Sequence, residues 1–261
     1  MDSPDGGRNF RLRRKRSLAG RIGVLLLRLA LAFVVLSVLG VLALRFVAPP
    51  ASAFMVQRQA EAWWERDHDY RSRHEWRDWE EISPELRIAV VASEDQKFPT
   101  HHGFDWDAIE SALEHNREGR RVHGASTISQ QTAKNLFLWP GRSWLRKGLE
   151  AWFTVLLETL LPKRRILELY LNVAEFGDGV YGAEAASQAY FRKPASRLTR
   201  REAALLAAVL PSPRKLHPDR PSRYVLAAAA WVERQIEQLG GPAYLAELEP
   251  KRQAAVRPRR A

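Results

Sequence analysis

The sequence has no cysteine among its 261 residues, which excludes disulfide bonds, thiolate zinc sites, iron–sulfur clusters and a cysteine nucleophile. It also lacks the G-x-S-x-G, Walker A and G-x-G-x-x-G motifs of serine hydrolases and of phosphate-binding loops. Runs of alternating polar and apolar residues are scarce, whereas helix signals recur along the chain. The sequence therefore predicts a mainly α-helical protein whose chemistry does not depend on sulfur.

Positive charge is concentrated at the two ends of the chain. The formal net charge is +11, from 41 Lys and Arg against 30 Asp and Glu. Residues 1–21 hold seven cations and two anions, and residues 251–261 hold five further cations. The body between them is close to neutral, whereas nucleic-acid-binding domains carry a basic stripe on the fold itself. We therefore expect no nucleic-acid partner.

A long apolar run follows the first basic segment. Ile22 to Leu44 contains a single charge, Arg28, which lies near enough to the end of the run to reach the headgroups. The cationic flank predicts a cytoplasmic N-terminus, with everything after about residue 46 outside. The run exceeds the apolar core of a signal peptide, roughly 7–15 residues, which favours an uncleaved anchor. The small-residue sequence Ala51-Ser52-Ala53 leaves cleavage open.

Capping and stop signals divide the rest of the chain. The tryptophan-rich stretch before Ser83 is equally compatible with contact at the membrane interface and with an amphipathic helix packed on the core. Thr199 and Glu202 form a capping box, which favours a structural role for this glutamate. The predicted parts are a basic cytoplasmic segment (1–21), a transmembrane anchor (22–46), a juxtamembrane segment (47–82), the main domain (83–240) and a basic C-terminal tail (241–261). The predicted helices are 84–95, 106–119, 127–138 capped by Ser126, 144–161 capped by Ser143, 162–177 opened by Pro162, and 224–239.

Two predicted helices place charged groups where apolar ones are expected. Arg146 and Glu150 share the apolar face of the helix from Trp144, and burying them is costly unless they pair or face a cleft. At this level a buried i,i+4 ion pair and a functional site are equally supported. On the preceding helix, Thr127, Gln131 and Lys134 form a polar stripe. Together with Lys147, the cations Lys134 and Arg146 would suit a pyrophosphate.

Glu94 closes the helix that begins at Pro84. There it meets the negative end of the helix dipole and the like charge of Asp95, so its pKa is expected to rise toward that of a general base. The alternative is an exposed glutamate at a frayed helix end. His101 and His102 lack the helical spacing or cysteine support of a zinc site, so we expect no metal ligands here.

Five segments of the chain, in this order, resemble the motifs of glycosyltransferase family 51, the peptidoglycan glycosyltransferases. The segment 94–103 reads EDQKFPTHHG and is similar to the first motif, E-D-x-x-F-x-x-H-x-G. The segment 124–135 reads GASTISQQTAKN and is similar to the second, G-[GA]-S-T-[IL]-[ST]-Q-Q-x-x-K-N. The segments 146–150 (RKGLE), 163–177 (KRRILELYLNVAEFG) and 202–211 (EAALLAAVLP) resemble the third, fourth and fifth.

This resemblance implies a mainly α-helical, lysozyme-like glycosyltransferase domain preceded by one N-terminal transmembrane helix. The implied activity is the polymerisation of lipid II into β-1,4 glycan strands with inversion, without transpeptidation. It implies the bacterial inner (cytoplasmic) membrane, with the domain on the periplasmic side, and other cell-wall synthesis proteins as potential partners. No tightly bound cofactor is expected, although a divalent cation such as Mg²⁺ is compatible with Glu150. The implied catalytic residues are Glu94 and Glu150, and the implied substrate-binding residues are Asp95, Phe98, His101, Thr127, Gln131, Lys134, Asn135, Arg146 and Lys147.

Two other functions remain as alternatives. A lysozyme-like lytic enzyme would also use paired carboxylates, but a hydrolase of a neutral sugar bond has no use for three cations beside the site. A non-catalytic membrane scaffold of cell-wall assembly would retain its function in cells after replacement of Glu94.

Overall fold

The structure, a computed structural model, describes residues 18–117, 126–141 and 143–249. The chain divides into two units, Met1–Gly40 and Val41–Ala261, and each is described by itself. The described residues are mostly helical, with three very short strands, which confirms the predicted fold class.

Helix α1 (Leu18–Ala43) contains the apolar run that the sequence predicts to span a membrane. Its segment Gly20–Ala43 is 24 residues long and is apolar enough to cross a bilayer. The helix ends before the predicted end of the anchor at residue 46, because the next residues form a turn in which Phe46 N–H donates to the carbonyl of Ala43. The length and composition of α1 fit a single-pass anchor.

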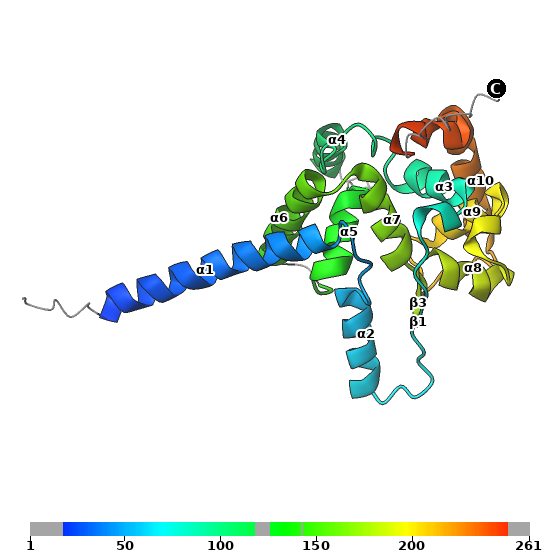
Figure 1. The fold of residues 1–261 in the computed structure, drawn as a ribbon. Helices are drawn as coiled ribbons and strands as arrows, with labels where there is room; N and C mark the ends of the chain where they lie inside the picture. Colours follow the sequence, from blue (N-terminus) through cyan, green and yellow to red (C-terminus); the bar gives the residue numbers. More distant parts are fainter. Residues whose placement is uncertain (1–17, 118–125, 142, 250–261) are drawn as a thin grey trace, which may run out of the picture. The chain divides into compact units, whose positions relative to one another are not determined.

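The second unit contains the remaining described helices and a small sheet (Figure 1). Its α-helices are α2 (Ala53–Trp64), α3 (Pro84–Glu94), α4 (Trp106–Arg117), α5 (Ile128–Phe137), α6 (Trp144–Leu160), α7 (Lys163–Val173), α8 (Ala183–Phe191), α9 (Arg200–Val209) and α10 (Arg223–Gln238). Its 3-10 helices are η1 (Trp79–Glu81), η2 (Ala195–Arg197) and η3 (Gly241–Leu248), and its strands are β1 (Arg73–His74), β2 (Glu175–Gly177) and β3 (Val180–Tyr181).

Helix α3 is buried along its whole middle section. Ser83 caps its first turn and Pro84 opens it, as the sequence predicts. Residues Leu86 to Ala92 are all buried, because α9, α10 and η3 pack around the helix. The end of α3 is less enclosed, and this end carries Glu94.

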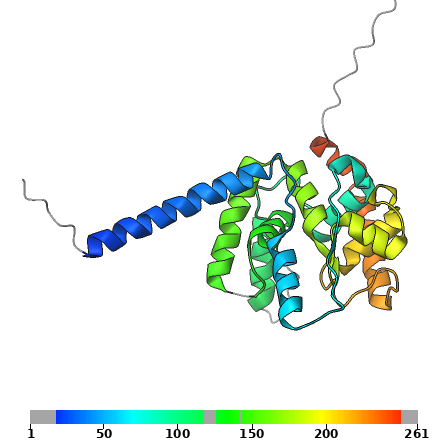
Figure 2. The same ribbon diagram turned by 60° about the horizontal axis from the view of Figure 1, so that its bottom comes forward.

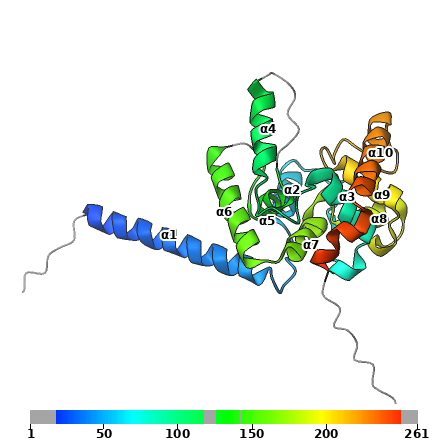
Figure 3. The same cartoon turned by 90° about the horizontal axis from the view of Figure 1, so that it is seen from above.

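Helix α5 lies between α6 and α7, and α2 packs against it as well (Figure 3). The rings of Phe137 and Phe153 stack with centroids 4.2 Å apart and join α5 to α6. Figure 2 shows α5 and α6 in green on one side of the unit, with the yellow and orange helices α8 to α10 on the other. The loop that leaves α3 therefore connects two groups of helices.

The cap of α5 corrects one prediction. Thr127, and not Ser126, is the N-cap: its hydroxyl accepts from Gln130 N–H, and the Gln130 side chain accepts from Thr127 N–H. This T-x-x-Q pattern is a capping box, which satisfies two free donors at once. By contrast, the predicted caps Ser143 of α6 and Thr199 of α9 are confirmed, and α6 ends one residue before the predicted Leu161.

The predicted helix from Pro162 to Gly177 is too long. Helix α7 ends at Val173, and Glu175–Gly177 forms strand β2 in a sheet of order β1-β3-β2. The chain turns back at Asp178 and Gly179, and Gly182, which caps the following helix α8, has a φ of +84°, and an added Cβ there would lie 2.6 Å from the carbonyl oxygen of Asn172. Asn172 in turn exchanges hydrogen bonds of 2.8 and 2.9 Å with the backbone of Arg77.

The stretch 47–82, predicted as a juxtamembrane segment, belongs to the second unit. Trp79 is fully buried, 4.2 Å from the guanidinium of Arg87, and Met55 and Ala62 of α2 are buried. These contacts support the packing interpretation for most of the stretch. Trp63 and Trp64 are 78% and 82% exposed, and their contact with a membrane interface stays a prediction.

Residues 241–249, at the start of the predicted tail, pack on the rest of the second unit. Leu245 of η3 is buried, and the Tyr244 hydroxyl donates to the carbonyl of Gln96 at 2.8 Å. The Glu249 carboxylate accepts from Trp79 Nε1 at 3.0 Å and from Arg87 Nη1 at 2.6 Å. Residues 250–261 lie outside the described part of the chain.

Candidate active site

Glu94 is placed by the junction between α3 and α5. The next residue, Asp95, is buried and accepts from the backbone N–H of Ile128, the first residue of α5, at 2.9 Å. Asp95 also accepts from Nε2 of His101 at 2.8 Å. Asp95, held by His101, thus joins the end of α3 to the start of α5.

Gln131 approaches Glu94 from the first turns of α5. Its Nε2 donates to Glu94 Oε2 at 2.7 Å, and its Oε1 accepts from the hydroxyl of Tyr170 at 3.1 Å. Burial raises the pKa of Glu94, whereas the hydrogen bond from Gln131 and the charge of Lys134 lower it. The predicted rise is confirmed in direction. Its largest cause is burial, and Asp95 contributes less to the rise in pKa than its adjacent position in the sequence indicated.

The second predicted carboxylate, Glu150, lies on α6 and is 3% exposed. It accepts from Arg146 Nη1 at 2.8 Å and from Lys147 Nζ at 2.5 Å. The predicted pairing of Arg146 with Glu150 is therefore present, with Lys147 as a further partner. Among the described residues, Arg146 Nε is a buried donor with no hydrogen-bond partner.

Lys134 lies within electrostatic range of both carboxylates. Burial lowers the pKa of Lys134, Glu150 and Glu94 each act to raise it, and Arg146 and Lys147 act to lower it. The ammonium group of Lys134 therefore interacts electrostatically with Glu94 and with Glu150 and its two cationic partners. The structure brings a carboxylate with a raised pKa and three cations, Lys134, Arg146 and Lys147, to one site where α3, α5 and α6 meet.

Known proteins with similar sequences match this chain over most of its length. A family model described as transglycosylase matches residues 61–237. The chain belongs to the transglycosylase family. It is 60% identical over 215 residues to the biosynthetic peptidoglycan transglycosylase of Xanthomonas campestris pv. campestris, covering 82% of this chain and 87% of that protein. The protein of the same name from Pseudomonas fluorescens is 57% identical over 222 residues, covering 85% and 92% of the two chains. That from Pseudomonas entomophila is 55% identical over 225 residues, covering 86% and 95%.

Several other residues predicted to bind substrate face the interior of this transglycosylase. The hydroxyl of Thr127, besides capping α5, donates to the carbonyl of Gly103 at 2.7 Å. Phe98 is fully buried, with the ammonium of Lys163 4.5 Å from its ring centroid. Asn135 is half-buried on α5. The contacts of Thr127 and Phe98 hold the framework of the site, and their contact with substrate stays a prediction.

A network behind Asp95 escaped the sequence analysis. Lys163 Nζ donates to Glu158 at 2.8 Å, Ser129 also donates to Glu158, and Lys163 lies 3.5 Å from Nδ1 of His101. The N–H of Gly103 donates to that same Nδ1 at 3.0 Å, so the ring hydrogen of His101 sits on Nε2, toward Asp95. The sequence offered one signal for this network, because the carboxylate of Glu158 and the cation of Lys163 flank the helix stop at Pro162. Nothing in the neighbouring sequence indicates that these two side chains contact α5.

Tyr170 is a second residue near Glu94 that the sequence pattern did not indicate. It lies on the apolar face of α7 with Ile166, Leu169 and Val173, so its pattern is that of a core residue. A buried phenol normally needs a partner for its hydroxyl, and this requirement was the available signal.

The binding of a divalent cation beside Glu150 stays a prediction. Both carboxylate oxygens of Glu150 accept from cationic side chains, and Lys134 adds a further positive charge. In the part of the chain that the structure describes, three or more His, Asp or Glu side chains nowhere gather as metal ligands. The arrangement favours binding of an anion.

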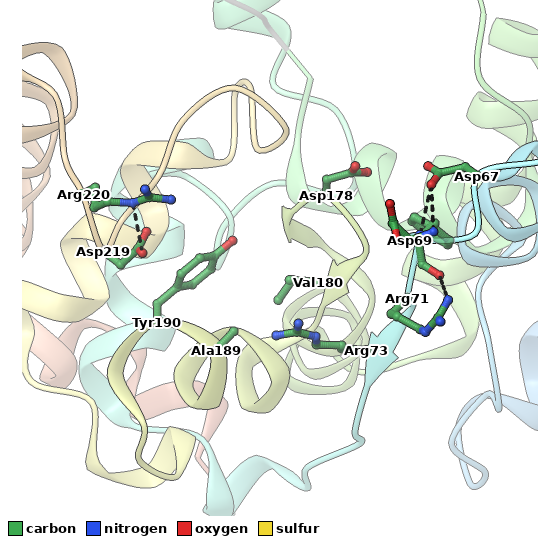
Figure 4. A pocket seen from close by; sticks show the side chains of 11 residues that line it. Asp67, Asp69, Arg71, Arg73, Asp178, Val180, Ala189, Tyr190, Asp219 and Arg220 are labelled. Carbon is green, nitrogen blue, oxygen red and sulfur yellow. Dashed lines mark hydrogen bonds and ion pairs between the residues drawn. The ribbon is translucent and has the colours of Figure 1, made fainter.

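A polar cavity of about 540 Å³ lies apart from this cluster, between β1, β3, α8 and the loop after α2 (Figure 4). None of the predicted site residues lines it. Among its charged groups, Arg220 lies 3.6 Å from Asp219, Asp178 lies 3.4 Å from Arg58 outside the lining, and Arg71 donates to the carbonyl of Tyr70 at 2.9 Å. Glu94, Lys134 and Glu150 lie instead on α3, α5 and α6.

Proposed function

We infer that the chain is a peptidoglycan glycosyltransferase, and we propose that it polymerises lipid II at the site formed by α3, α5 and α6. The activity follows from its membership of the transglycosylase family and from its identity to relatives named biosynthetic peptidoglycan transglycosylase. The observation that carries the placement is that Lys134 lies under the influence of both Glu94 and Glu150. One site then offers a proton acceptor and cations, which the transfer requires together.

Glu94 is the proposed general base. The 4-hydroxyl of an incoming lipid II attacks C1 of the donor sugar, and Glu94 takes the hydroxyl proton as the new glycosidic bond forms. The bond between C1 and the phosphate oxygen breaks, and the pyrophosphate leaves with its electron pair, so that the anomeric centre inverts. A raised pKa supports this role, because a carboxylate with an ordinary pKa is a weak base at neutral pH.

Arg146, Lys134 and Lys147 are the proposed partners of the departing pyrophosphate. The buried Nε–H of Arg146 supports this, because a phosphate oxygen would supply the partner that the described residues do not. Fixed cations at the place where charge develops stabilise the transition state without protonating the leaving group. Glu150 orients Arg146 and Lys147 through its two short hydrogen bonds.

The anchor has a function in this proposal. Helix α1 would span the inner membrane with residues 1–21 in the cytoplasm and the second unit outside, following the distribution of positive charge. Because the lipid tails of both substrates stay in the bilayer, an anchored enzyme meets them on one surface at a raised effective concentration. Other cell-wall synthesis proteins stay potential partners.

The test offers the full-length protein two substrates separately, lipid II and finished glycan strands. We expect polymer from lipid II and no cleavage of finished glycan, and Glu94→Gln should lower the rate of polymerisation by roughly 10²–10⁴-fold. Cleavage of glycan would favour the lytic alternative. Retained turnover by Glu94→Gln would refute the role of Glu94, and complementation by this variant in cells would favour a scaffold.

A further inference from the structure

Tyr170 is a buried polar group behind the proposed base. It lies in α7, which packs against α5, and its side chain is 1% exposed. Its hydroxyl donates to Oε1 of Gln131 at 3.1 Å. The phenol makes its hydrogen bond to Gln131 rather than to Glu94, so any hydrogen-bonded effect on the base must pass through Gln131.

The amide of Gln131 has two unlike ends, and its orientation matters. A carboxylate accepts hydrogen bonds only, so Glu94 requires the amino group of Gln131 and is repelled by the carbonyl oxygen. In the structure Nε2 faces Glu94 at 2.7 Å, and Tyr170 engages Oε1 at the other end. Burial raises the pKa of Tyr170 well above its ordinary value, so the phenol keeps its proton and can donate.

We propose that Tyr170 is a positioning residue for the reaction, which aims the amino group of Gln131 at Glu94 by holding the opposite end of the amide. This inference rests on the proposed function of Glu94 as the base. It deepens that proposal by assigning the orientation of the base to a residue of α7.

A hydrogen bond to the ionised carboxylate stabilises the form of Glu94 that acts as base. The groups that act on Glu94 are Asp95 and Ser93 of its own helix and Gln131 and Lys134 of α5, and Tyr170 of α7 interacts with it electrostatically. Burial opposes ionisation, and Gln131 is the first group to counter it. Loss of the tyrosine hydroxyl should therefore let the amide move and make Glu94 harder to ionise.

The experiment compares the pH profile of kcat/KM for lipid II between the full-length protein and Tyr170→Phe. We expect the acid limb of Tyr170→Phe to move to higher pH by roughly one pH unit, as loss of one hydrogen bond to an ionised group would cause. The rate should approach the wild-type plateau at high pH, with an unchanged KM. An acid limb that stays in place overturns the proposal, because a merely structural defect lowers the rate at every pH.

A double-mutant cycle tests whether Tyr170 acts through Gln131. In a Gln131→Ala background, Tyr170→Phe should cause no further displacement of the acid limb, and an additive displacement contradicts the proposal. Tyr190→Phe is the matched control, since it also removes a hydroxyl, which donates to the carbonyl of Phe176 at 3.2 Å away from the cluster. Turnover by Glu94→Gln would refute the base itself, whereas an inactive Glu94→Gln with an unmoved Tyr170→Phe profile would refute this inference alone.

Discussion

The two carboxylates of the site, the half-buried Glu94 and the buried Glu150, have surroundings that differ in kind. Glu94 receives a hydrogen bond from the neutral amide of Gln131, and its pKa rises because burial outweighs that bond and the charge of Lys134. Glu150 is 3% exposed and has a cationic partner on each oxygen, Arg146 at 2.8 Å and Lys147 at 2.5 Å. The neighbours of Glu94 do not offset the cost of burying its charge, whereas each oxygen of Glu150 has a cationic partner.

This difference separates their chemistry. A carboxylate with a raised pKa binds a proton more readily than an ordinary carboxylate does, which suits a general base. A carboxylate with a cationic partner on each oxygen serves to fix those cations in place. The same residue type thus supplies proton transfer at the end of α3 and charge organisation on α6, because different neighbours surround it.

Among the substitutions that test this difference between the two carboxylates, Glu150→Gln is expected to have the largest effect, which is a loss of stability. Removal of the anion leaves Arg146 without its buried partner, and loss of one member of a buried pair typically costs about 3–5 kcal/mol. We expect thermal unfolding of the full-length protein at a clearly lower temperature, together with loss of polymerisation. Lys147→Ala is the control, since Lys147 is 47% exposed and should cost much less. A Glu150→Gln variant as stable as wild type would mean that the pairs contribute nothing.

A smaller effect of opposite sign is expected for the stability of Glu94→Gln. A raised pKa in the folded state means that the contribution of Glu94 to stability is fully present below its ordinary pKa of 4.5 and is lost as the pH rises through the raised value. A pKa that differs by one between the folded and unfolded states corresponds to about 1.4 kcal/mol. Glu94→Gln should therefore be more stable than wild type at pH 8, and the difference should disappear near pH 4. Chemical denaturation at both pH values measures this, and an equal difference at both would contradict the assigned environment.

The smallest effect is expected at a pair outside the site, which provides a reference. Arg201 of α9 lies 3.0 Å from Glu233 of α10, and its side chain is 45% exposed. Exposed pairs typically contribute less than about 1 kcal/mol, because water screens the charges. Arg201→Ala should leave the polymerisation rate unchanged and shift the unfolding temperature little. A large loss here would show that ion pairs in this protein stabilise it irrespective of burial.

Local signals predicted the parts of the structure that depend on neighbouring residues. The caps Ser143 and Thr199 and the pairing of Arg146 with Glu150 involve residues three or four apart on one helix, so sequence spacing specifies them. The end of α7 was placed too late, because strand β2 forms only where it pairs with β3, which in turn pairs with β1 from a distant part of the chain. The packing of Tyr244 onto Gln96 was missed for the same reason, since the two are distant in the chain.

What the sequence determined by itself is a helix long and apolar enough to span a membrane, the helical class, the pairing within α6 and the presence of a glutamate at the end of α3. Only the tertiary structure decided which groups surround that glutamate and how they shift its pKa. Its donor Gln131, the nearby cation Lys134 and the tyrosine behind them come from α5 and α7. The physical reason is that the pKa of a buried carboxylate depends on desolvation and on neighbours in space, and both arise only when separate helices pack together.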